Sequence, residues 1–379
     1  MIETLRVSNY RSLGPEVELG LERLSILVGP NGSGKSNALD AIAFMRDAVV
    51  DGLPAAVTHR GGIDSVRRRS AGHPNNVSLS ARLRWDGGQG EYAFELTGDR
   101  FEEYRVKTEW AVVEAEGERH EFTRVGLIWE GPEGLAPALA HEALVLTTLG
   151  GDPRFRPLFE QLSKMVIYAI FPDTLGRPQN FDKTRPMRSH GENWVSTLRE
   201  MVKDEALKQE LVVGLHKLTG DIEDVRVTRA ADFLVAEFKQ ATKGAKSKRW
   251  FSARQQSDGT LRVAGILTAL LQEPPLPVLG VEEPELTVHP GALPLLFDYL
   301  RQSSERSQVL ITSHSPILLD CADVDRDALF VVERHAGVTE IARVADDTLA
   351  PVRSRLLSLG DLLATGALQL ELPFEAESA

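Results

Sequence analysis

The feature that most constrains this sequence is a glycine-rich octapeptide at residues 29–36, with the letters GPNGSGKS. It fits the pattern G-x-x-x-x-G-K-[ST] at every fixed position. It stands between an apolar segment at residues 24–28 and a segment of helical periodicity at residues 35–50. A strand that passes through such a loop into a helix points backbone N–H groups and the positive end of the helix dipole at one place. The pattern therefore predicts a phosphate-binding loop in an α/β fold.

Two side chains of the loop have separate expected roles. Lys35 is expected to reach the β- and γ-phosphates of a nucleotide. The Ser36 hydroxyl is expected to bind Mg²⁺, a hard ion that keeps most of its waters and takes few protein ligands. A coincidental glycine-rich turn is the weaker interpretation, because the flanking strand and helix are both predicted. The other residues predicted to bind the nucleotide from this segment are Asn31, Gly32, Ser33, Gly34 and Asn37.

Composition narrows the class of protein. The 379 residues are 42% hydrophobic and 26% charged, which predicts one large domain or two linked domains with a substantial core. The longest nearly unbroken apolar run, residues 263–271, is far shorter than the roughly 20 residues of a membrane span. The formal net charge of −12 argues against a surface coated for non-specific nucleic-acid binding. The start of the chain lacks the pattern of a secretory signal and Cys321 is the only cysteine, so we expect a cytoplasmic protein.

Periodicity predicts the order of the elements along the chain. Antiparallel strands are expected at residues 2–7, 77–85, 91–96 and 105–113, a helix or helix pair at 192–218, and short strands at 225–228 and 233–238. Helices and strands then alternate, with helices at 260–271 and 292–303 and strands at 278–282, 309–312 and 329–332. The fold class is therefore α/β, with a mostly parallel core sheet, an N-terminal antiparallel β portion and an inserted β-rich and helical lobe. The predicted domains are residues 1–50 with 250–345 as the core, 51–249 as the lobe, and 346–379 as a helical segment and frayed tail.

Two consecutive carboxylates follow the apolar strand predicted at residues 278–282. Successive residues of a strand point to opposite sides, so Glu282 and Glu283 cannot do the same job. If Glu282 faces the phosphate loop, it holds the Mg²⁺ shell through water, and Glu283 can polarise an attacking water. The alternative is an acidic strand end that is only solvated. That alternative is less favoured because a phosphate loop is predicted in the same sheet.

Two further segments gain meaning only from their order in the chain. Residues 254–260, with the letters RQQSDGT, precede an apolar helix, so Ser257 or Asp258 is a good N-cap and Gly259 keeps the first turn open. Residues 311–316, with the letters ITSHSP, form a strand end that carries His314. Taken alone, a helix cap and a structural histidine are the simpler interpretations.

The order of phosphate loop, inserted lobe, Ser-Asp-Gly before a helix, carboxylate strand and Thr-Ser-His-Ser-Pro resembles the ABC-type ATPase head of the SMC, RecF and OLD families. The resemblance covers about residues 1–50 and 250–335. The opening Ser8-Asn9-Tyr10-Arg11-Ser12 is similar to the N-[FY]-[RK]-S of that group. The whole chain looks like the stand-alone bacterial relatives of OLD. No long heptad stretch predicts an SMC-type arm, and the OLD nuclease domain is expected to be missing.

The resemblance implies an ATPase that uses Mg²⁺, and it gives each residue a role. It implies that Arg11 approaches the nucleotide, that Glu283 is the catalytic base and that His314 senses the γ-phosphate. It further implies that Ser257 and Gly259 touch the ATP of an opposite subunit, in a homodimer that closes around two Mg·ATP. Glu285 and His289 fall in the E-P-E-x-x-x-H-P run of the OLD side of the group.

The same resemblance implies a biological setting. It implies a sensor or motor for DNA in bacterial antiviral defence or DNA maintenance, acting with a separately encoded effector such as a nuclease, and no membrane partner. The alternative is a slow nucleotide-gated clamp or scaffold that binds DNA or a protein. Two basic clusters, residues 67–69 and 243–249, are candidates for DNA contact, although solvated loops are the simpler interpretation.

The sequence departs from the group at two places. The acidic residue that ends the carboxylate strand is Glu282 where Asp is usual, and the Ser-Asp-Gly-Thr of residues 257–260 replaces the Ser-Gly-Gly-Gln of transporter heads. Both variants occur among OLD-like relatives, and they leave the turnover rate open. The glutamine that usually follows the first lobe has three equal candidates, Gln89, Gln161 and Gln179.

Overall fold

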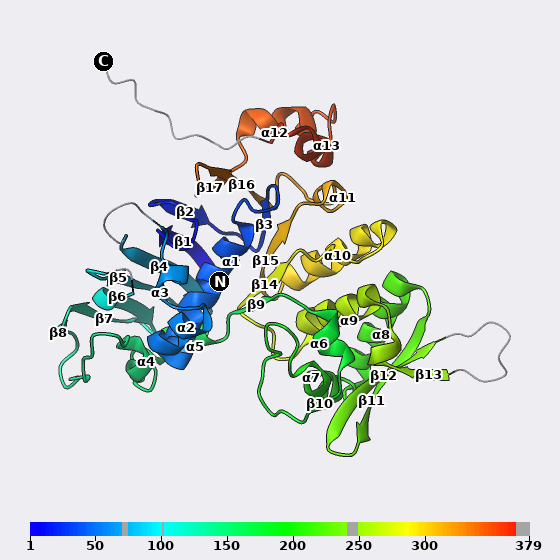
Figure 1. The fold of residues 1–379 in the computed structure, drawn as a ribbon, viewed down its shortest axis with the longest axis horizontal. Helices are drawn as coiled ribbons and strands as arrows, with labels where there is room; N and C mark the ends of the chain where they lie inside the picture. The colour runs from blue at the N-terminus through cyan, green and yellow to red at the C-terminus, as the bar shows by residue number, and fades with distance from the viewer. Residues whose placement is uncertain (70–74, 101, 241–248, 369–379) are drawn as a thin grey trace. The chain divides into compact units, whose positions relative to one another are not determined.

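A computed structural model describes residues 1–69, 75–100, 102–240 and 249–368 (Figure 1). The chain forms two compact units. Unit 1 contains Met1–Met165, Val324–Ser358 and the residues from Leu362 on, and unit 2 contains Val166–Asp323 and Leu359–Asp361. The division into an ATPase core and an inserted lobe stays a prediction.

An antiparallel sheet of seven strands forms much of unit 1 (Figure 1). In β4, Val77, Leu79, Ala81 and Leu83 are buried and alternate with more exposed residues, as expected for a strand with one face on a core. All four antiparallel strands predicted between residues 2 and 113 are confirmed. In spatial order the strands are β2 (Val17–Gly20), β1 (Ile2–Ser8), β4 (Val77–Trp85), β5 (Gly88–Thr97), β6 (Arg105–Ala115), β7 (Glu118–Val125) and β8 (Ile128–Glu130).

A second group of strands in unit 1 carries the glycine-rich loop. β3 (Leu24–Val28) is buried at every position and pairs in parallel with β16 (Ala328–His335), which pairs antiparallel with β17 (Val338–Arg343). The loop leads into α1 (Lys35–Asp47). The ring centroid of Phe44 in this helix lies 5.3 Å from that of Tyr10 and 6.2 Å from that of Phe94 on β5. Helix α1 therefore packs on the antiparallel sheet.

The helix predicted at residues 35–50 ends three residues early and continues in another geometry. A π-helical turn, η1 (Ala48–Gly52), follows α1, and Gly52 at φ +91° separates it from α2 (Leu53–His59). The other helices of this unit are α3 (Ile63–Val66), α4 (Leu146–Leu149), α5 (Arg156–Ser163) and α12 (Asp346–Arg353), and α13 (Leu359–Thr365) follows α12 in the chain.

A fully buried glutamate ties the loop before α4 to the antiparallel sheet. Glu109 of β6 accepts hydrogen bonds from the backbone N–H groups of Val145 (2.7 Å) and Leu146 (2.9 Å) and from the Tyr92 hydroxyl (3.0 Å). Its ion-pair partner Arg124 lies 3.6 Å away, and both side chains are completely buried. Arg124 also donates to the carbonyl oxygens of Gly126, Ala140 and Ala143. Each charge is therefore compensated, as burial requires.

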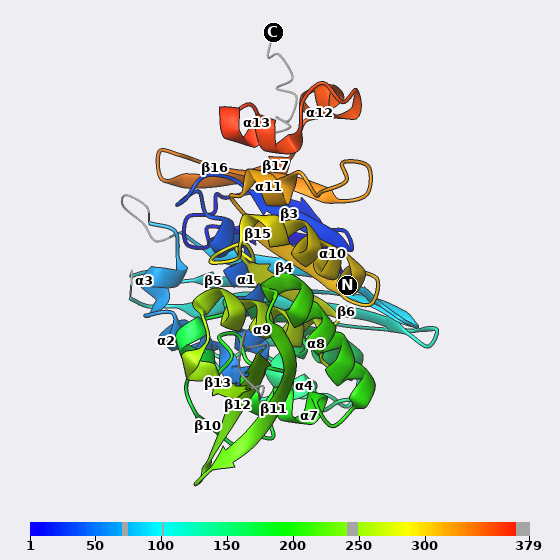
Figure 2. The ribbon, with the colours of Figure 1, turned by 90° about the vertical axis from the view of Figure 1, so that its right-hand side faces the viewer.

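Unit 2 is built around one mostly apolar helix that is buried on every side. In α9 (Asp258–Leu271) every residue from Leu261 to Leu271 is buried, which is typical of a helix covered all round. Trp194 of α7 (Trp194–Met201) donates from its indole N–H to the Thr268 hydroxyl (3.0 Å). Gly214 of α8 (Glu205–Thr219) allows the close approach of Leu267, and Figure 2 shows α8 beside α9. The helix pair predicted at 192–218 and the helix at 260–271 are confirmed.

The parallel strands of unit 2 are β9 (Val166–Tyr168), β14 (Val278–Glu282) and β15 (Gln308–Ser313). β14 lies between the other two and pairs in parallel with both. A smaller antiparallel sheet contains β10 (Gln179–Asn180), β11 (Ile222–Ala230), β12 (Phe233–Gln240) and β13 (Arg249–Ser252). Of the basic cluster at 243–249, residues 243–248 lie outside the described residues. The remaining helices are α6 (Pro172–Gly176), η2 (Ala253–Gln255), η3 (Pro290–Ala292), α10 (Leu293–Ser304) and α11 (Pro316–Leu319).

The substitution Glu109→Gln should destabilise the protein strongly. It leaves Arg124 buried without its counter-charge, and removing one partner of such a pair costs about 3–5 kcal/mol. The free energy of unfolding in denaturant measures this. Glu114→Gln is the matched control, since Glu114 lies on the same strand but pairs with Arg119 at the surface, and its loss should change the stability little. Equal effects of the two substitutions would contradict the structural role of Glu109.

Candidate nucleotide-binding and catalytic site

Two glycines of the loop at 29–36 are required by the hairpin of β16 and β17. Gly34 has φ +111°, and a Cβ atom there would lie 2.4 Å from the Thr339 hydroxyl oxygen. A Cβ atom at Gly29 would lie 2.2 Å from the carbonyl oxygen of Val332. Both distances are far below van der Waals contact, so no other residue fits without a shift of the hairpin.

The lysine and the serine of the loop differ in exposure. Lys35 is buried, and its ammonium group donates to the carbonyl oxygens of Gly29 (2.8 Å) and Pro30 (3.0 Å). Ser36, in the first turn of α1, is exposed. Asn31 and Gly32, which precede the helix in the loop, are exposed as well. The charge of Lys35 is thus held at the loop, and the Ser36 hydroxyl is accessible at the N-terminus of a helix.

A chain of hydrogen bonds supports the loop from within unit 1. Asn37 Nδ2 donates to Ser12 Oγ (2.7 Å), Ser12 Oγ lies 2.7 Å from Thr339 Oγ1, and Thr339 Oγ1 donates to the carbonyl oxygen of Ser33 (2.7 Å). Because Thr339 uses its one hydrogen on Ser33, the Ser12 hydroxyl must donate to Thr339. The amide of Asn37, which the sequence places among the nucleotide ligands, therefore binds the protein itself. Thr339 was missed by sequence reasoning, since nothing local marks it.

Tyr10 and Arg11, near the start of the chain, bind the carboxylate of Asp40 on helix α1. Asp40 accepts from the Tyr10 hydroxyl (2.5 Å) and forms ion pairs with Arg11 (2.8 Å) and Arg60 (3.0 Å). Burial and the charge of Asp40 raise the pKa of Tyr10, so its hydroxyl stays a donor. Arg11 has φ +51°, an uncommon backbone conformation for this residue type. Asp40 was also missed from sequence. Its only mark is a position one turn beyond Ser36 on the same helix.

In unit 2, the two predicted carboxylates lie where strand β14 ends. Glu282 is its last residue, and Glu283 follows with φ +43°. The backbone N–H of Glu283 donates to the carbonyl and hydroxyl oxygens of Thr312 (both 3.1 Å). Arg262 of α9 donates to the carbonyl oxygens of Glu282 and Glu283 (both 3.1 Å), which holds this backbone in its strained form. Burial lowers the pKa of the Arg262 guanidinium, and the nearby carboxylates offset part of that shift.

His314 stands beside two carboxylates of unit 2. Its Nδ1 atom lies 3.7 Å from Glu283 Oε1 and 3.6 Å from Glu285 Oε1. Glu285 is buried and accepts from the Ser313 hydroxyl (2.7 Å) and from the backbone N–H of His314 (3.0 Å). The structure therefore brings together Glu283, Glu285 and His314.

The signature element, residues 257–260, begins helix α9. Ser257 is the N-cap and accepts from the backbone N–H of Thr260 (3.1 Å), and its side chain is exposed. Asp258 is the first helical residue instead of the cap. A Cβ atom at Gly259 would lie 2.4 Å from the carbonyl oxygen of Thr287, so this glycine permits a close approach as well as an open first turn.

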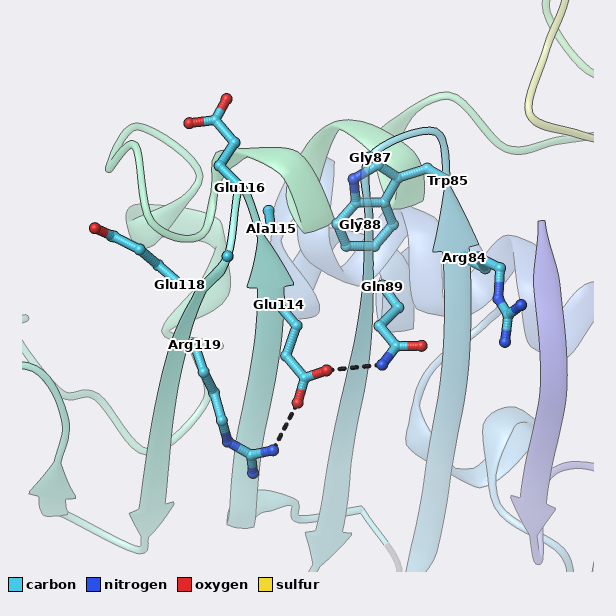
Figure 3. Close-up of a pocket in the computed structure, with 11 residues that line it drawn as sticks. Arg84, Trp85, Gly87, Gly88, Gln89, Glu114, Ala115, Glu116, Glu118 and Arg119 are labelled. Carbon is cyan, nitrogen blue, oxygen red and sulfur yellow. Dashed lines mark hydrogen bonds and ion pairs between the residues drawn. The ribbon is translucent and has the colours of Figure 1, made fainter.

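Other residues singled out from sequence have structural partners. His289 caps η3 by accepting from the backbone N–H of Gly291 (3.1 Å). Gln179 is buried and hydrogen-bonded to the backbone of Thr174, Gly191 and Val195. Gln89 lies at the end of the antiparallel sheet, where it donates to Glu114 (2.7 Å, Figure 3). Gln161 lies on α5 of unit 1, and the choice among the three glutamines stays open.

The sequence model of the family described as "AAA domain, putative AbiEii toxin, Type IV TA system" matches residues 24–146 and 153–320 of this chain. These ranges include the phosphate loop, the signature element, both strand-end glutamates and His314. The chain belongs to this AAA family. A comparison with curated proteins finds no match.

Solved structures show the same fold as this AAA protein. The SMC head bound to the C-winged helix domain of ScpA matches with a TM-score of 0.58 at 16% identity, over 93% of this chain and 99% of that one. The SMC head with an extended coiled coil, bound to the C-terminal domain of ScpA from Pyrococcus furiosus, matches with a TM-score of 0.56 at 15% identity, over 94% and 99%. The AAA protein therefore has the fold of a P-loop, ABC-type ATPase head of the SMC/RecF-like group, as predicted.

The described residues of this AAA protein include neither a membrane-spanning helix nor a cluster of metal ligands. None of the helices there has the length and apolar character needed to cross a membrane. Within the same residues, no group of three or more His, Cys, Asp or Glu side chains could hold a metal ion.

The substitution Thr339→Val should weaken the phosphate loop. It keeps the shape of the side chain, but the Ser33 carbonyl loses its donor from Thr339 and the Ser12 hydroxyl hydrogen loses its acceptor. Each such loss costs about 1–3 kcal/mol. We expect a lower melting temperature and weaker binding of Mg·ATP, measured by calorimetry. Thr339→Ser is the matched control because it keeps the hydroxyl group. If both variants bind alike, the hydrogen-bond chain does not support the loop.

Proposed function

We propose that this chain binds Mg·ATP and hydrolyses it. The observation that carries the proposal is the phosphate loop of unit 1, in which a left-handed Gly34, a buried Lys35 and an exposed Ser36 stand at the start of α1. Backbone N–H groups of the loop and the Lys35 ammonium would hold the β- and γ-phosphates. Ser36 would bind the Mg²⁺ ion, with Glu282 in its water shell. The other proposed contacts of the nucleotide are Arg11, Asn31, Gly32, Ser33, Gly34 and Asn37. The side-chain amide of Asn37 is taken by Ser12 in this structure, so the proposed contact of Asn37 is through its backbone N–H.

Glu283 is the proposed catalytic base. Glu283 lies just past the end of β14, and hydrogen bonds to Thr312 and Arg262 fix the position of its backbone, from which the carboxylate extends. A carboxylate held in this way can accept a proton from water as the water attacks the γ-phosphate. His314, within 3.7 Å of it, is the proposed sensor of that phosphate. A bound Mg²⁺ ion would supply neutralisation of the phosphate charge.

The substitution Glu283→Gln should leave Mg·ATP binding within a few-fold of wild type and slow hydrolysis by about 10²–10⁴-fold, the usual contribution of a general base. The amide keeps the size of the side chain but cannot accept the proton. Phosphate release under single-turnover conditions measures the effect. Glu210→Gln, at an exposed glutamate of α8, is the control and should hydrolyse at the wild-type rate. If Glu283→Gln also hydrolyses ATP at the wild-type rate, Glu283 is not the catalytic base.

We further propose that two copies close around two Mg·ATP. In unit 2, the exposed Ser257 and the half-buried Gly259 stand at a helix start, which suits an anion. Each ATP would then join the phosphate loop of one copy to the signature element of the other. Hydrolysis would remove charge from both contacts, so the nucleotide state would set the state of association.

Light scattering tests the dimer. Glu283→Gln, which should retain ATP, is expected to double its mass when Mg·ATP is added. Adding Ser257→Arg should abolish the doubling, because a long cation would occupy the phosphate position. Ser354→Arg, at an exposed serine of unit 1, is the control of equal charge. A mass that ATP does not change, or equal behaviour of the two arginine variants, would overturn the sandwich.

For the biological role we propose a DNA-related sensor or motor in bacterial antiviral defence or DNA maintenance, with a separate effector such as a nuclease. The membership in an SMC-like group of ATPases supports it. Of the basic cluster at 67–69, Arg67 donates to the carbonyl oxygens of Arg100 and Glu103 and Arg68 donates to Asn9, so these two side chains already have partners in unit 1. The cluster at 243–249 is the stronger candidate for DNA.

The alternative is a slow clamp or scaffold that hydrolyses ATP only to release its partner. Glu282, one methylene longer than the usual aspartate, leaves the turnover rate open, so slow turnover is compatible with the site. The SMC heads of the matched structures are bound to domains of ScpA, which shows that this fold can carry a protein partner. Turnover that DNA stimulates supports the motor, whereas tight ATP-dependent assembly with negligible turnover supports the clamp.

A further inference from the structure

We propose that Glu285 is a positioning residue for His314: its buried carboxylate fixes the backbone of the histidine and draws the hydrogen on Nδ1 away from Glu283. The inference rests on the proposed ATPase function and deepens it. Glu285 is not proposed to touch the nucleotide or the attacking water. It acts through the side chain that does.

The topology of unit 2 brings the two residues together. β14 and β15 are parallel neighbours, with Glu282 opposite Thr312 in the register. Glu285 lies three residues beyond the first of these and His314 two residues beyond the second, so both follow strand ends at the same edge. The Glu285 side chain is only 6% exposed. It reaches from the loop after β14 to the turn after β15.

Glu285 closes the turn that carries the histidine. Its Oε1 atom accepts from the Ser313 hydroxyl (2.7 Å) and from the backbone N–H of His314 (3.0 Å). Ser313 Oγ in turn accepts from the backbone N–H of Ser315 (3.0 Å). One carboxylate oxygen thus holds three consecutive residues, and the position of the imidazole depends on it.

Two polar atoms in this cluster are buried and lack hydrogen bonds. Among the described residues, neither Glu285 Oε2 nor His314 Nδ1 has a partner within hydrogen-bond distance. A buried polar atom without a partner costs free energy, so each one calls for an explanation. His314 Nδ1 lies 3.6 Å from the other oxygen of the same carboxylate, Oε1, just beyond hydrogen-bond distance. This arrangement points to a side chain that changes partner during its work.

The chemistry of the neighbours decides which ring nitrogen carries a hydrogen. His314 Nδ1 faces two carboxylates, at 3.6 Å and 3.7 Å, and ionised carboxylates only accept hydrogen bonds. The hydrogen therefore belongs on Nδ1, which leaves Nε2 for a ligand. A small rotation of the ring gives that hydrogen to Glu285 or to Glu283. When Glu285 receives it, the carboxylate of Glu283 remains free to accept a proton from water.

The competition predicts how loss of Glu285 should appear in the kinetics. Without a charged acceptor at 285, the Nδ1 hydrogen turns to Glu283 and occupies the proposed base. Hydrolysis should slow, while Mg·ATP binding, which depends on the phosphate loop, should not change. We therefore expect Glu285→Gln to lower kcat by about 10–100-fold, the usual effect of a residue that orients a functional histidine. KM and the melting temperature should stay near the wild-type values.

A double-mutant cycle on the full chain tests the inference. Steady-state phosphate release is measured for wild type, Glu285→Gln, His314→Ala and the double variant. If Glu285 acts through His314, Glu285→Gln should lower kcat by less than about twofold once the imidazole is absent, because residues that act as a unit are not additive. A role in folding alone would lower kcat by the same factor in both backgrounds, and that result would overturn the inference.

A second variant keeps the test valid if Glu285→Gln does not fold. Ser313→Ala removes one donor from Glu285 and leaves the carboxylate in place, so it should lower kcat less, and again only when His314 is present. The failure of the proposed function has a different appearance: wild-type protein would release no phosphate at all, and the inference would fall with it. If wild-type protein is active but the effects of Glu285→Gln and His314→Ala on kcat multiply, only the role of Glu285 is refuted and the proposed function stands.

Discussion

The phosphate loop depends on the close passage of the β16–β17 hairpin. A loop that turns its N–H groups towards a ligand must satisfy its carbonyl oxygens elsewhere, and Thr339 of β17 does this for Ser33. The same passage leaves no room for a Cβ atom at Gly29 or Gly34. The residues that meet here, Ser12 and Thr339, are 327 positions apart. The geometry of the loop is therefore set by the folding of unit 1 as a whole, and its local sequence is only one of the conditions.

Unit 2 has an equivalent fixed point in Arg262. This residue stands in the second turn of α9, where it is the only charged residue among the buried ones. It donates to the carbonyl oxygens of Ile170, Glu282 and Glu283. One guanidinium thus ties the start of α9 to the ends of two strands. Such a cation is tolerated in the core because every carbonyl it meets is an acceptor that the strand ends leave unpaired. The signature element and the carboxylates therefore share one rigid support.

Local patterns predicted what local chemistry determines. The bounds of β3, β4 and β14 followed from apolar runs and alternation, and capping narrowed the helix start to Ser257 or Asp258, of which the structure has Ser257. Thr339 and Asp40 could not be found in this way, because each matters through a partner far along the chain and has an ordinary neighbourhood in the sequence. Gly259 shows the boundary between the two cases. Its place after an N-cap could be predicted from the sequence. The need for a glycine there could not, because it comes from the Thr287 carbonyl, which the loop after β14 brings close only in the folded protein.

Glu109 and Glu285 show how one residue type serves two purposes in the same chain. Both carboxylates are buried. Glu109 has bonds to both oxygens and a counter-charge, and nothing is left to exchange. Glu285 has bonds to one oxygen only, and the other is buried without a partner among the described residues. A sequence that folds to one state satisfies its buried polar groups wherever stability alone decides. The incomplete set around Glu285 and His314 stands next to the proposed base, where the proposed exchange of the Nδ1 hydrogen between Glu285 and Glu283 needs an acceptor that is not already occupied.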